Sequence, residues 1–224
     1  MYQIPYGVIV PQQVEGLLVP VAVSATHMGF GTIRMEPCWM QLGYAAGVAA
    51  DLSLKQSVPI RSVSIDQLQD ELLRQGQLIT YFRDLAPTSP VGKACQYFGT
   101  KGFFPTYDAC AEEAVTLNEA SRWIVQARSL EGGRRLPVLP ATDRLLPAGV
   151  DMGPRLPAVE LHPREYWEEV SSLPRNMLES WISLAARTLG VKKPQLEAKE
   201  QEPVTKGYLL YVLYALLEQS RQKQ

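Results

Sequence analysis

Apolar residues recur at helical spacing through most of this 224-residue chain. Residues at positions i, i+3 and i+4 lie on one face of an α-helix, so this spacing predicts amphipathic helices. Ser64 and Thr116 each begin a sequence typical of an N-terminal capping box, and Gly76 is a suitable helix stop. The predicted helices occupy residues 37–54, 65–75, 91–101, 117–129, 164–171, 175–189 and 206–219.

A different pattern occurs near the N-terminus, where residues 16–23 read GLLVPVAV. This run is apolar without alternation, which is typical of a strand buried on both faces of a sheet. Residues 4–10 (IPYGVIV) are the candidate for one antiparallel partner, and no later segment resembles a strand. The predicted fold class is therefore mainly α (α+β), with short N-terminal strands from an incomplete sheet followed by helix–loop–helix units.

The best candidate for a domain boundary is residues 131–163, which contain six prolines and four glycines. This composition predicts an extended linker between helical units at 81–130 and 164–224. The two helical units have a similar order of features: a helix, a glycine, a loop containing proline and an acidic pair, a Val-Thr pair and a second helix. This order predicts two similar helix–loop–helix units.

Composition and charge exclude several classes of function. The formal net charge is −1, from 22 basic and 23 acidic residues, which gives no global attraction for nucleic acid. No apolar run reaches the roughly 18 residues of a membrane span, and no signal-peptide pattern assigns a localisation. The three cysteines, Cys38, Cys95 and Cys110, lack CxxC spacing, and the chain has two histidines. We therefore expect free thiols, no metal site and no hydrolytic Ser/His/Asp triad.

The most informative stretch is residues 24–47, SATHMGFGTIRMEPCWMQLGYAAG. A loop rich in glycine leads to a helix whose small residues recur three and four positions apart, which suits close approach of another backbone. Core packing explains this stripe of small residues better than cofactor contact does. The small residues are Gly43, Ala46, Gly47 and Ala50. The methionines of the stretch, Met28, Met35 and Met40, are predicted to fill the core.

This stretch resembles the C-terminal flavin-contacting segment of FAD-dependent oxidoreductases, some of which are labelled xanthan lyase-like. The resemblance runs from YQIPYGVIVP at residue 2, through LLVPVAVSATH and GTIRMEP, to LQDELLRQGQ at residues 68–77. It implies that residues 1–80 are the C-terminal piece of an FAD-binding domain. In such a domain a final strand leads through this loop to the helix.

The resemblance implies a role in FAD binding for residues between Ser24 and Pro37. Reduced flavin gathers negative charge along N1 and the C2 carbonyl, which a helix N-terminus at Pro37 would stabilise. Arg34 would add a fixed positive charge. The backbone of Gly31, Thr32 and Ile33 would approach the cofactor, and the hydroxyls of Thr26 and Thr32 would bond ribityl oxygens.

Two of the residues in this stretch have alternative explanations. The resemblance suggests His27 as a catalytic acid–base group on the substrate side, whereas a single loop histidine is more often a hydrogen-bonded structural residue. For Arg34 the alternative is an ion pair with Glu36 or with another surface carboxylate.

The nucleotide-binding half of such an enzyme is missing, because no GxGxxG strand–turn–helix occurs in the chain. We therefore expect the C-terminal portion of an FAD-dependent oxidoreductase that is inactive alone and binds FAD weakly or not at all. Its expected partner is an N-terminal Rossmann-type FAD portion or a complementing chain. A strand at residues 17–23 without its sheet also predicts self-association through that edge.

Residues 81–130 resemble S-layer-homology modules, in which a glycine-containing loop joins two helices. The segment carrying this resemblance is YFRDLAPTSPVGKACQYFGTKGFFPTYDACAEEAVTLNEASRWI, without the usual tryptophan before the first helix. The alternative function is thus a non-enzymatic helical interaction module that binds a cell surface or a protein.

Overall fold

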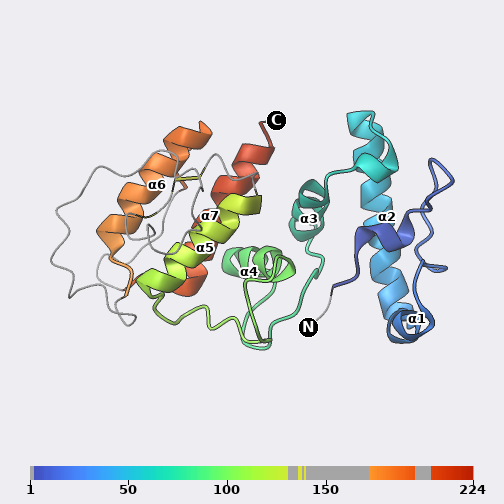
Figure 1. Cartoon of the computed structure of the whole chain (residues 1–224), viewed down its shortest axis with the longest axis horizontal. Helices are drawn as coiled ribbons and strands as arrows, with labels where there is room; N and C mark the ends of the chain where they lie inside the picture. Colours follow the sequence, from blue (N-terminus) through green and yellow to red (C-terminus); the bar gives the residue numbers. More distant parts are fainter. Residues whose placement is uncertain (1–2, 131–135, 138, 140–171, 195–202, 224) are drawn as a thin grey trace, which may run out of the picture. The chain divides into compact units, whose positions relative to one another are not determined.

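The computed structural model describes residues 3–130, 136–137, 139, 172–194 and 203–223 (Figure 1). Within these residues the structure contains seven α-helices and two short 3-10 helices, η1 and η2. The chain divides into two compact units, Met1–Thr80 and Tyr81–Gln224, called here the N-terminal and C-terminal units. None of the described helices is both long enough and apolar enough to cross a membrane.

The prediction of N-terminal strands is wrong: no strand occurs in the described residues of this region. Tyr6–Ile9 forms η1, and residues 17–23 are irregular. Two isolated hydrogen bonds, each 2.8 Å long, run from the N–H groups of Val19, within residues 17–23, and Ser24, directly after them, to the carbonyls of Ile9 and Val8. A strand requires a continuous ladder, and Pro20 has no N–H to donate. The apolar run therefore packs without forming a sheet, and the described fold is helical.

The N-terminal unit is built around α2 (Glu36–Gln56). Before it lies α1 (His27–Ile33), and after it come η2 (Ile60–Ser62) and α3 (Ile65–Arg74). Two small apolar clusters form the core on the inner side of α2. One contains Ile9, Val23, Ile33, Leu42 and Ala46, and the other contains Val48, Ala49, Val63, Leu68 and Leu72.

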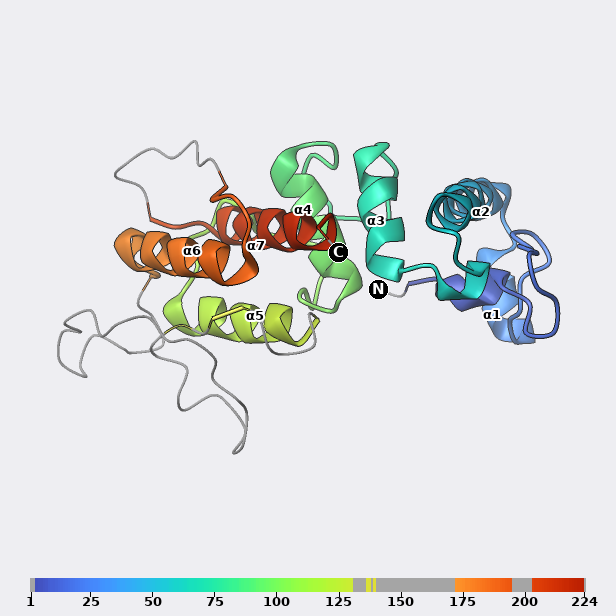
Figure 2. The ribbon, with the colours of Figure 1, turned by 90° about the horizontal axis from the view of Figure 1, so that it is seen from above.

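The C-terminal unit contains α4 (Pro90–Thr100), α5 (Leu117–Leu130), α6 (Arg175–Leu189) and α7 (Lys206–Arg221). Figures 1 and 2 show α5, α6 and α7 running alongside one another, with α4 crossing α7. Helix α7 is apolar on most of its surface and packs against the other three helices, which explains its burial. The helices predicted for residues 81–130 and 164–224 thus pack in one unit.

The described helices confirm most of the predicted ranges. The agreement is explained by local capping, which defines where each helix begins. The Oγ atoms of Ser64, Thr116 and Thr205 accept hydrogen bonds from the backbone N–H three residues later, at 3.4, 3.2 and 3.3 Å. Each bond satisfies a donor that the first turn leaves free. The predicted helix at 164–171 and most of the predicted linker at 131–163 lie outside the described residues.

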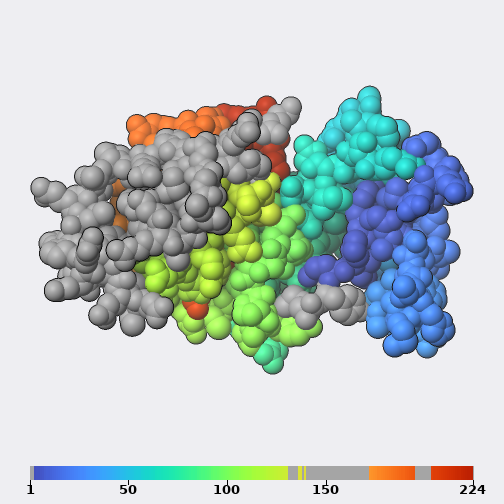
Figure 3. Space-filling model, in the orientation of Figure 1, coloured from blue at the N-terminus to red at the C-terminus, as the bar shows by residue number. Residues whose placement is uncertain are grey.

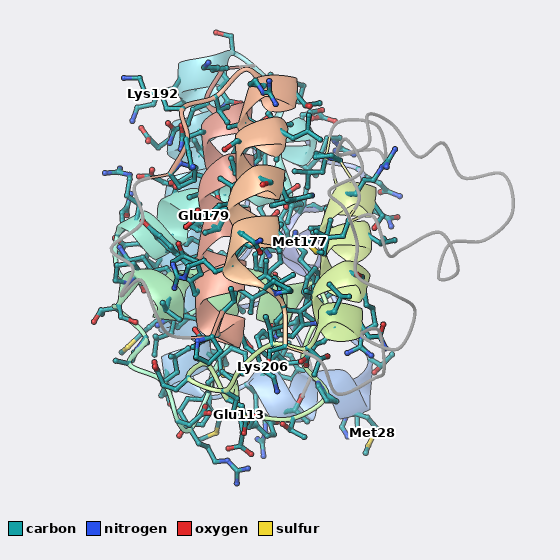
Figure 4. The ribbon with its side chains drawn as sticks, turned by 90° about the vertical axis from the view of Figure 1, so that its left-hand side faces the viewer. Met28, Glu113, Met177, Glu179, Lys192 and Lys206 are labelled. Carbon is teal, nitrogen blue, oxygen red and sulfur yellow. The ribbon has the colours of Figure 1, made fainter. Side chains whose placement is uncertain are left out.

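The N-termini of α5 and α7 are joined by backbone hydrogen bonds, called here the cap seam (residues 111–116 with 204–207). The N–H of Val115 donates to the Val204 carbonyl at 2.9 Å. The N–H groups of Lys206 and Gly207 donate to the carbonyls of Glu113 and Ala111, also at 2.9 Å. The Lys206 ammonium also lies 2.8 Å from the Glu113 carboxylate (Figure 4). The cap seam therefore fixes the starts of both helices together.

A second structured turn precedes α4, where Asp84 binds the loop that leads to α5. Its carboxylate accepts hydrogen bonds from the backbone N–H groups of Ala109, at 2.8 Å, and Cys110, at 2.7 Å. Partial burial opposes ionisation, but these two N–H groups outweigh it and lower the pKa of Asp84 below its usual 3.8. The ionised carboxylate thus holds residues 84 and 109–110 together.

The lowered pKa predicts an acid-dependent loss of stability that the Asp84→Asn variant lacks. A group with a depressed pKa stabilises the folded state above its unfolded pKa, near 3.8 here, and loses this contribution as pH falls through the folded pKa. Because the carboxylate is largely exposed, we expect Asp84→Asn to lower the free energy of unfolding at pH 7 by about 1 kcal/mol. Urea unfolding of the variant and of the unaltered chain, at pH 7 and below pH 4, measures this difference in the free energy of unfolding. An equal pH dependence in both proteins would contradict the prediction.

Candidate functional site

The sequence-predicted site residues lie in a helix–turn–helix segment, where a loop was expected. Thr26 caps α1: its Oγ1 accepts a hydrogen bond from the Gly29 N–H at 3.2 Å. The chain then turns at Arg34 and Met35 and enters α2 at Glu36. This segment, residues 26–37, forms an exposed surface of the N-terminal unit, coloured blue to light blue in Figure 3. The site residues are therefore close in sequence and held by two successive helix starts.

The two threonine hydroxyls are exposed but already make one hydrogen bond each within α1. Thr26 accepts from Gly29, and Thr32 donates to the Gly29 carbonyl at 2.8 Å. A hydroxyl has one donor and two acceptor positions. Thr26 thus keeps its donor and Thr32 keeps its acceptors for an outside ligand such as a polyol.

Gly31 and Ile33 differ in what they offer a ligand. Gly31 is exposed, and a Cβ built there would meet no atom within 4 Å. Packing within the chain therefore does not require this glycine, which leaves room for close approach from outside. The Ile33 side chain is only 6% exposed and packs in the core, so this residue offers only its backbone.

The start of α2 offers fewer donors than the sequence predicts. The helix begins at Glu36, so Pro37 is its second residue and contributes no N–H. The N–H groups of Cys38 and Trp39 both donate to the Met35 carbonyl, at 2.9 and 3.2 Å. Among the described residues, the Glu36 N–H remains for an outside acceptor. It lies beside the Glu36 carboxylate, whose negative charge opposes binding of an anion.

Arg34 is exposed and forms no ion pair within the part of the chain that the structure describes. The predicted alternative, pairing with Glu36, is therefore not observed. An unpaired guanidinium beside a helix start is available for an anionic or electron-rich ligand. It is the strongest polar feature of this segment.

His27 is the first residue of α1 and is exposed. Among the described residues, no hydrogen bond from a neighbouring group orients its imidazole. The described residues also contain no group of three or more His, Cys, Asp or Glu side chains suited to a metal ion. Its catalytic role remains a prediction.

The prediction that three methionines fill the core is wrong. Met28, Met35 and Met40 are 80%, 57% and 74% exposed. Figure 4 shows the Met28 side chain extending away from the ribbon. Their hydrophobicity predicted burial, but the described chain has no element that covers them. The sequence reasoning also missed that Glu36, rather than Pro37, begins α2.

These residues fit the flavin end of FAD in their chemistry. Gly31 leaves open space, and Thr26 and Thr32 retain hydroxyl positions for ribityl oxygens. Arg34 supplies a positive charge that has no ion-pair partner among the described residues. The Glu36 carboxylate is the one unfavourable group of the segment. The candidate site is thus formed by one segment of the chain, residues 26–37.

Comparison with known proteins agrees with this description. Residues 1–72, about a third of the chain, match the family model described as FAD dependent oxidoreductase. No curated protein matches the chain, and no solved structure does. The matched region contains the whole helix–turn–helix segment from Thr26 to Pro37. The N-terminal unit therefore contains a region similar to FAD-dependent oxidoreductases, whereas the similarity of residues 81–130 to S-layer-homology modules stays a prediction.

Proposed function

We propose that residues 1–72 are the C-terminal part of an FAD-dependent oxidoreductase and supply the flavin-contacting half of its cofactor site. The family match that spans Thr26 to Pro37 carries this proposal. FAD, when bound, accepts two electrons and a proton from a substrate. The residues of this chain bind and orient the ring end of the cofactor.

Each residue of the segment has a distinct role in the proposed site. The Arg34 guanidinium stabilises negative charge on the reduced ring, and the Glu36 N–H adds one donor. Gly31 allows the backbone to lie against the cofactor, and Thr26 and Thr32 bond ribityl hydroxyls. The Glu36 carboxylate reduces the positive potential, which weakens binding of an electron-rich ring.

The nucleotide-binding half of the proposed site must come from outside these 224 residues, because they contain no GxGxxG nucleotide-binding sequence. Charge-assisted hydrogen bonds contribute roughly 1.5–3 kcal/mol each. The loss of translational and rotational freedom on association costs about 4–15 kcal/mol. The few donors of this segment therefore support only weak binding of FAD by the chain alone.

Flavin retention in a completed protein tests the proposal. The chain is fused behind the nucleotide-binding half of a protein of this family whose own C-terminal segment has been removed. We expect Arg34→Ala to weaken FAD binding about 10- to 100-fold, from the loss of one charge-assisted contact. Gly31→Val should weaken it by filling the open space, and Glu36→Gln should strengthen it. Titration of FAD followed by flavin fluorescence measures all three.

Arg74→Ala is the matched control, since it removes an exposed arginine of the same unit that pairs with Glu71. It should leave FAD affinity unchanged. Tight FAD binding by the unfused chain would overturn the requirement for a nucleotide-binding half outside these 224 residues. Equal FAD affinity of the fused protein with and without Arg34→Ala and Gly31→Val would overturn the assignment of the segment.

A second function, for the C-terminal unit, is supported by its cap seam. We propose that this unit is a helical interaction module related to S-layer-homology modules. Gly102 and Gly190, with φ of +79° and +66°, follow α4 and α6, and a Val-Thr pair precedes α5 and α7 in each half. Co-sedimentation with peptidoglycan carrying secondary wall polysaccharide tests this. Failure of the chain to sediment would overturn a role in wall binding.

A further inference from the structure

Over residues 37–50, helix α2 carries apolar side chains on most of its circumference, with Gln41 as an exposed polar residue. No charged residue occurs between Glu36 and Asp51. One side carries the buried residues Leu42, Ala46, Val48 and Ala49. The opposite side, called here the outer face, also carries large apolar side chains: Met40, Tyr44 and Leu54 are 74%, 41% and 81% exposed. The Tyr44 hydroxyl donates a hydrogen bond to Gln75 Oε1 at 2.6 Å, and the ion pair of Asp51 with Lys55 lies towards the C-terminal end of the same face. Such a helix is typically buried on all sides.

The outer face has two glycines at its centre, Gly43 and Gly47. A Cβ built at either position would meet no atom within 4 Å. Glycine is a poor helix former, and nothing in the described chain uses the space that these two residues leave. Figure 2, which looks roughly along α2, shows one side of the helix without a neighbouring element of the N-terminal unit. The glycines thus provide room for a backbone from outside the chain.

We propose that the outer face of α2 binds the outer face of α2 in a second copy of this chain, antiparallel and crossing at Gly47. The positions of the residues are symmetric about this glycine. Met40 and Leu54 lie at equal distances before and after it, as do Tyr44 and Ala50. A two-fold axis through Gly47 therefore places Met40 against Leu54 of the second copy, which is the self-complementarity that a symmetric dimer requires.

Charge selects this antiparallel arrangement over a parallel one. Glu36 lies at the start of α2 and Lys55 near its end. Antiparallel helices bring Glu36 within about one turn of Lys55 of the second copy, and their dipoles also attract. Parallel helices would place Glu36 and Asp51 beside the same carboxylates of the second copy. Among the described residues Glu36 has no ion-pair partner, whereas Lys55 contacts Asp51 at 2.7 Å.

Sedimentation velocity on the full chain tests the proposal. We expect a reversible dimer of twice the 24.9 kDa chain mass in the micromolar range. Gly47→Leu should weaken the dimer at least about tenfold, because a side chain at the crossing point separates the two helices. Gln41→Leu is the matched control: it adds the same side chain at an exposed position off the outer face and should not change the dissociation constant.

Cross-linking determines the direction of the helices, in a background with Cys38 and Cys110 replaced by serine. We expect a short thiol cross-linker to join Met40→Cys chains to Leu54→Cys chains when they are mixed, and neither variant to itself. A monomer at all concentrations would overturn the proposal and leave the outer face to a different polypeptide. A dimer unaffected by Gly47→Leu, or one in which each variant cross-links to itself, would also overturn it. The proposal does not depend on flavin binding.

Discussion

Replacing Trp181 by alanine is expected to destabilise the C-terminal unit by about 3–5 kcal/mol, because it leaves a large cavity in the core. Trp181 lies on α6, is 0% exposed and is among the largest fully buried side chains. Its Nε1–H also donates a hydrogen bond to the Pro137 carbonyl at 2.9 Å. The side chain thus joins α6 to the chain that follows α5.

The Trp181→Phe variant separates these two contributions. Phenylalanine keeps much of the packing but leaves the buried Pro137 carbonyl without its donor, which costs about 1–3 kcal/mol. Urea unfolding, monitored by far-UV circular dichroism, gives the free energy of unfolding of both variants. If Trp181→Ala unfolded at the same urea concentration as the unaltered chain, the described core of α6 would be wrong.

Gly92→Ala is expected to destabilise the same unit by about 1–3 kcal/mol or more, through overpacking. Gly92 lies in the first turn of α4, where a Cβ would be 2.1 Å from the Ala86 carbonyl oxygen and 2.9 Å from the Ser89 Oγ. The Ser89 hydroxyl caps α4 through the Gly92 N–H at 2.9 Å. Because the nearest atom belongs to the backbone, relief of the contact requires the turn before α4 to move.

Gly31→Ala is the control for this substitution, since Gly31 is also helical and has open space around it. There alanine should be neutral or stabilising by up to about 1 kcal/mol. Thermal unfolding of both variants and the unaltered chain provides the comparison. Equal melting temperatures for Gly92→Ala and Gly31→Ala would show that the turn before α4 is not packed as described.

The helices were predictable because the signals that define them are local. A hydroxyl at Ser64 or Thr116 bonds an N–H three residues later, and apolar spacing shows which side is buried. These signals lie within one or two turns of the residues that they affect. The predicted range 175–189 agrees with α6 as observed.

The prediction of N-terminal strands failed because a strand depends on partners that are distant in sequence, and local signals do not show whether those partners are present. Residues 16–23 are apolar enough for a buried strand, but only isolated hydrogen bonds reach them in the described chain. The same reasoning failed for the exposed methionines of the flavin segment, such as Met40. A hydrophobic residue indicates that burial is favourable, but not which polypeptide provides the cover.

The position of the candidate site rests on a resemblance, and its local structure differs from the predicted loop. Resemblance selected Thr26 to Pro37, and the family match covers the same residues. Sequence alone did not reveal that α1 forms from the expected loop, since its two glycines disfavour a helix. Nor did it reveal that the N–H groups of Cys38 and Trp39 are already used by the Met35 carbonyl.

The cap seam has a consequence for how the two halves of the C-terminal unit can evolve. Its bonds join backbone atoms of Ala111, Glu113 and Val115 to those of residues 204–207, and a backbone bond does not depend on which side chain a residue carries. Substitutions along the seam can therefore accumulate while the pairing persists. Gly207 is an exception, because a Cβ there would lie 2.6 Å from the Val91 side chain and 2.9 Å from that of Ala111.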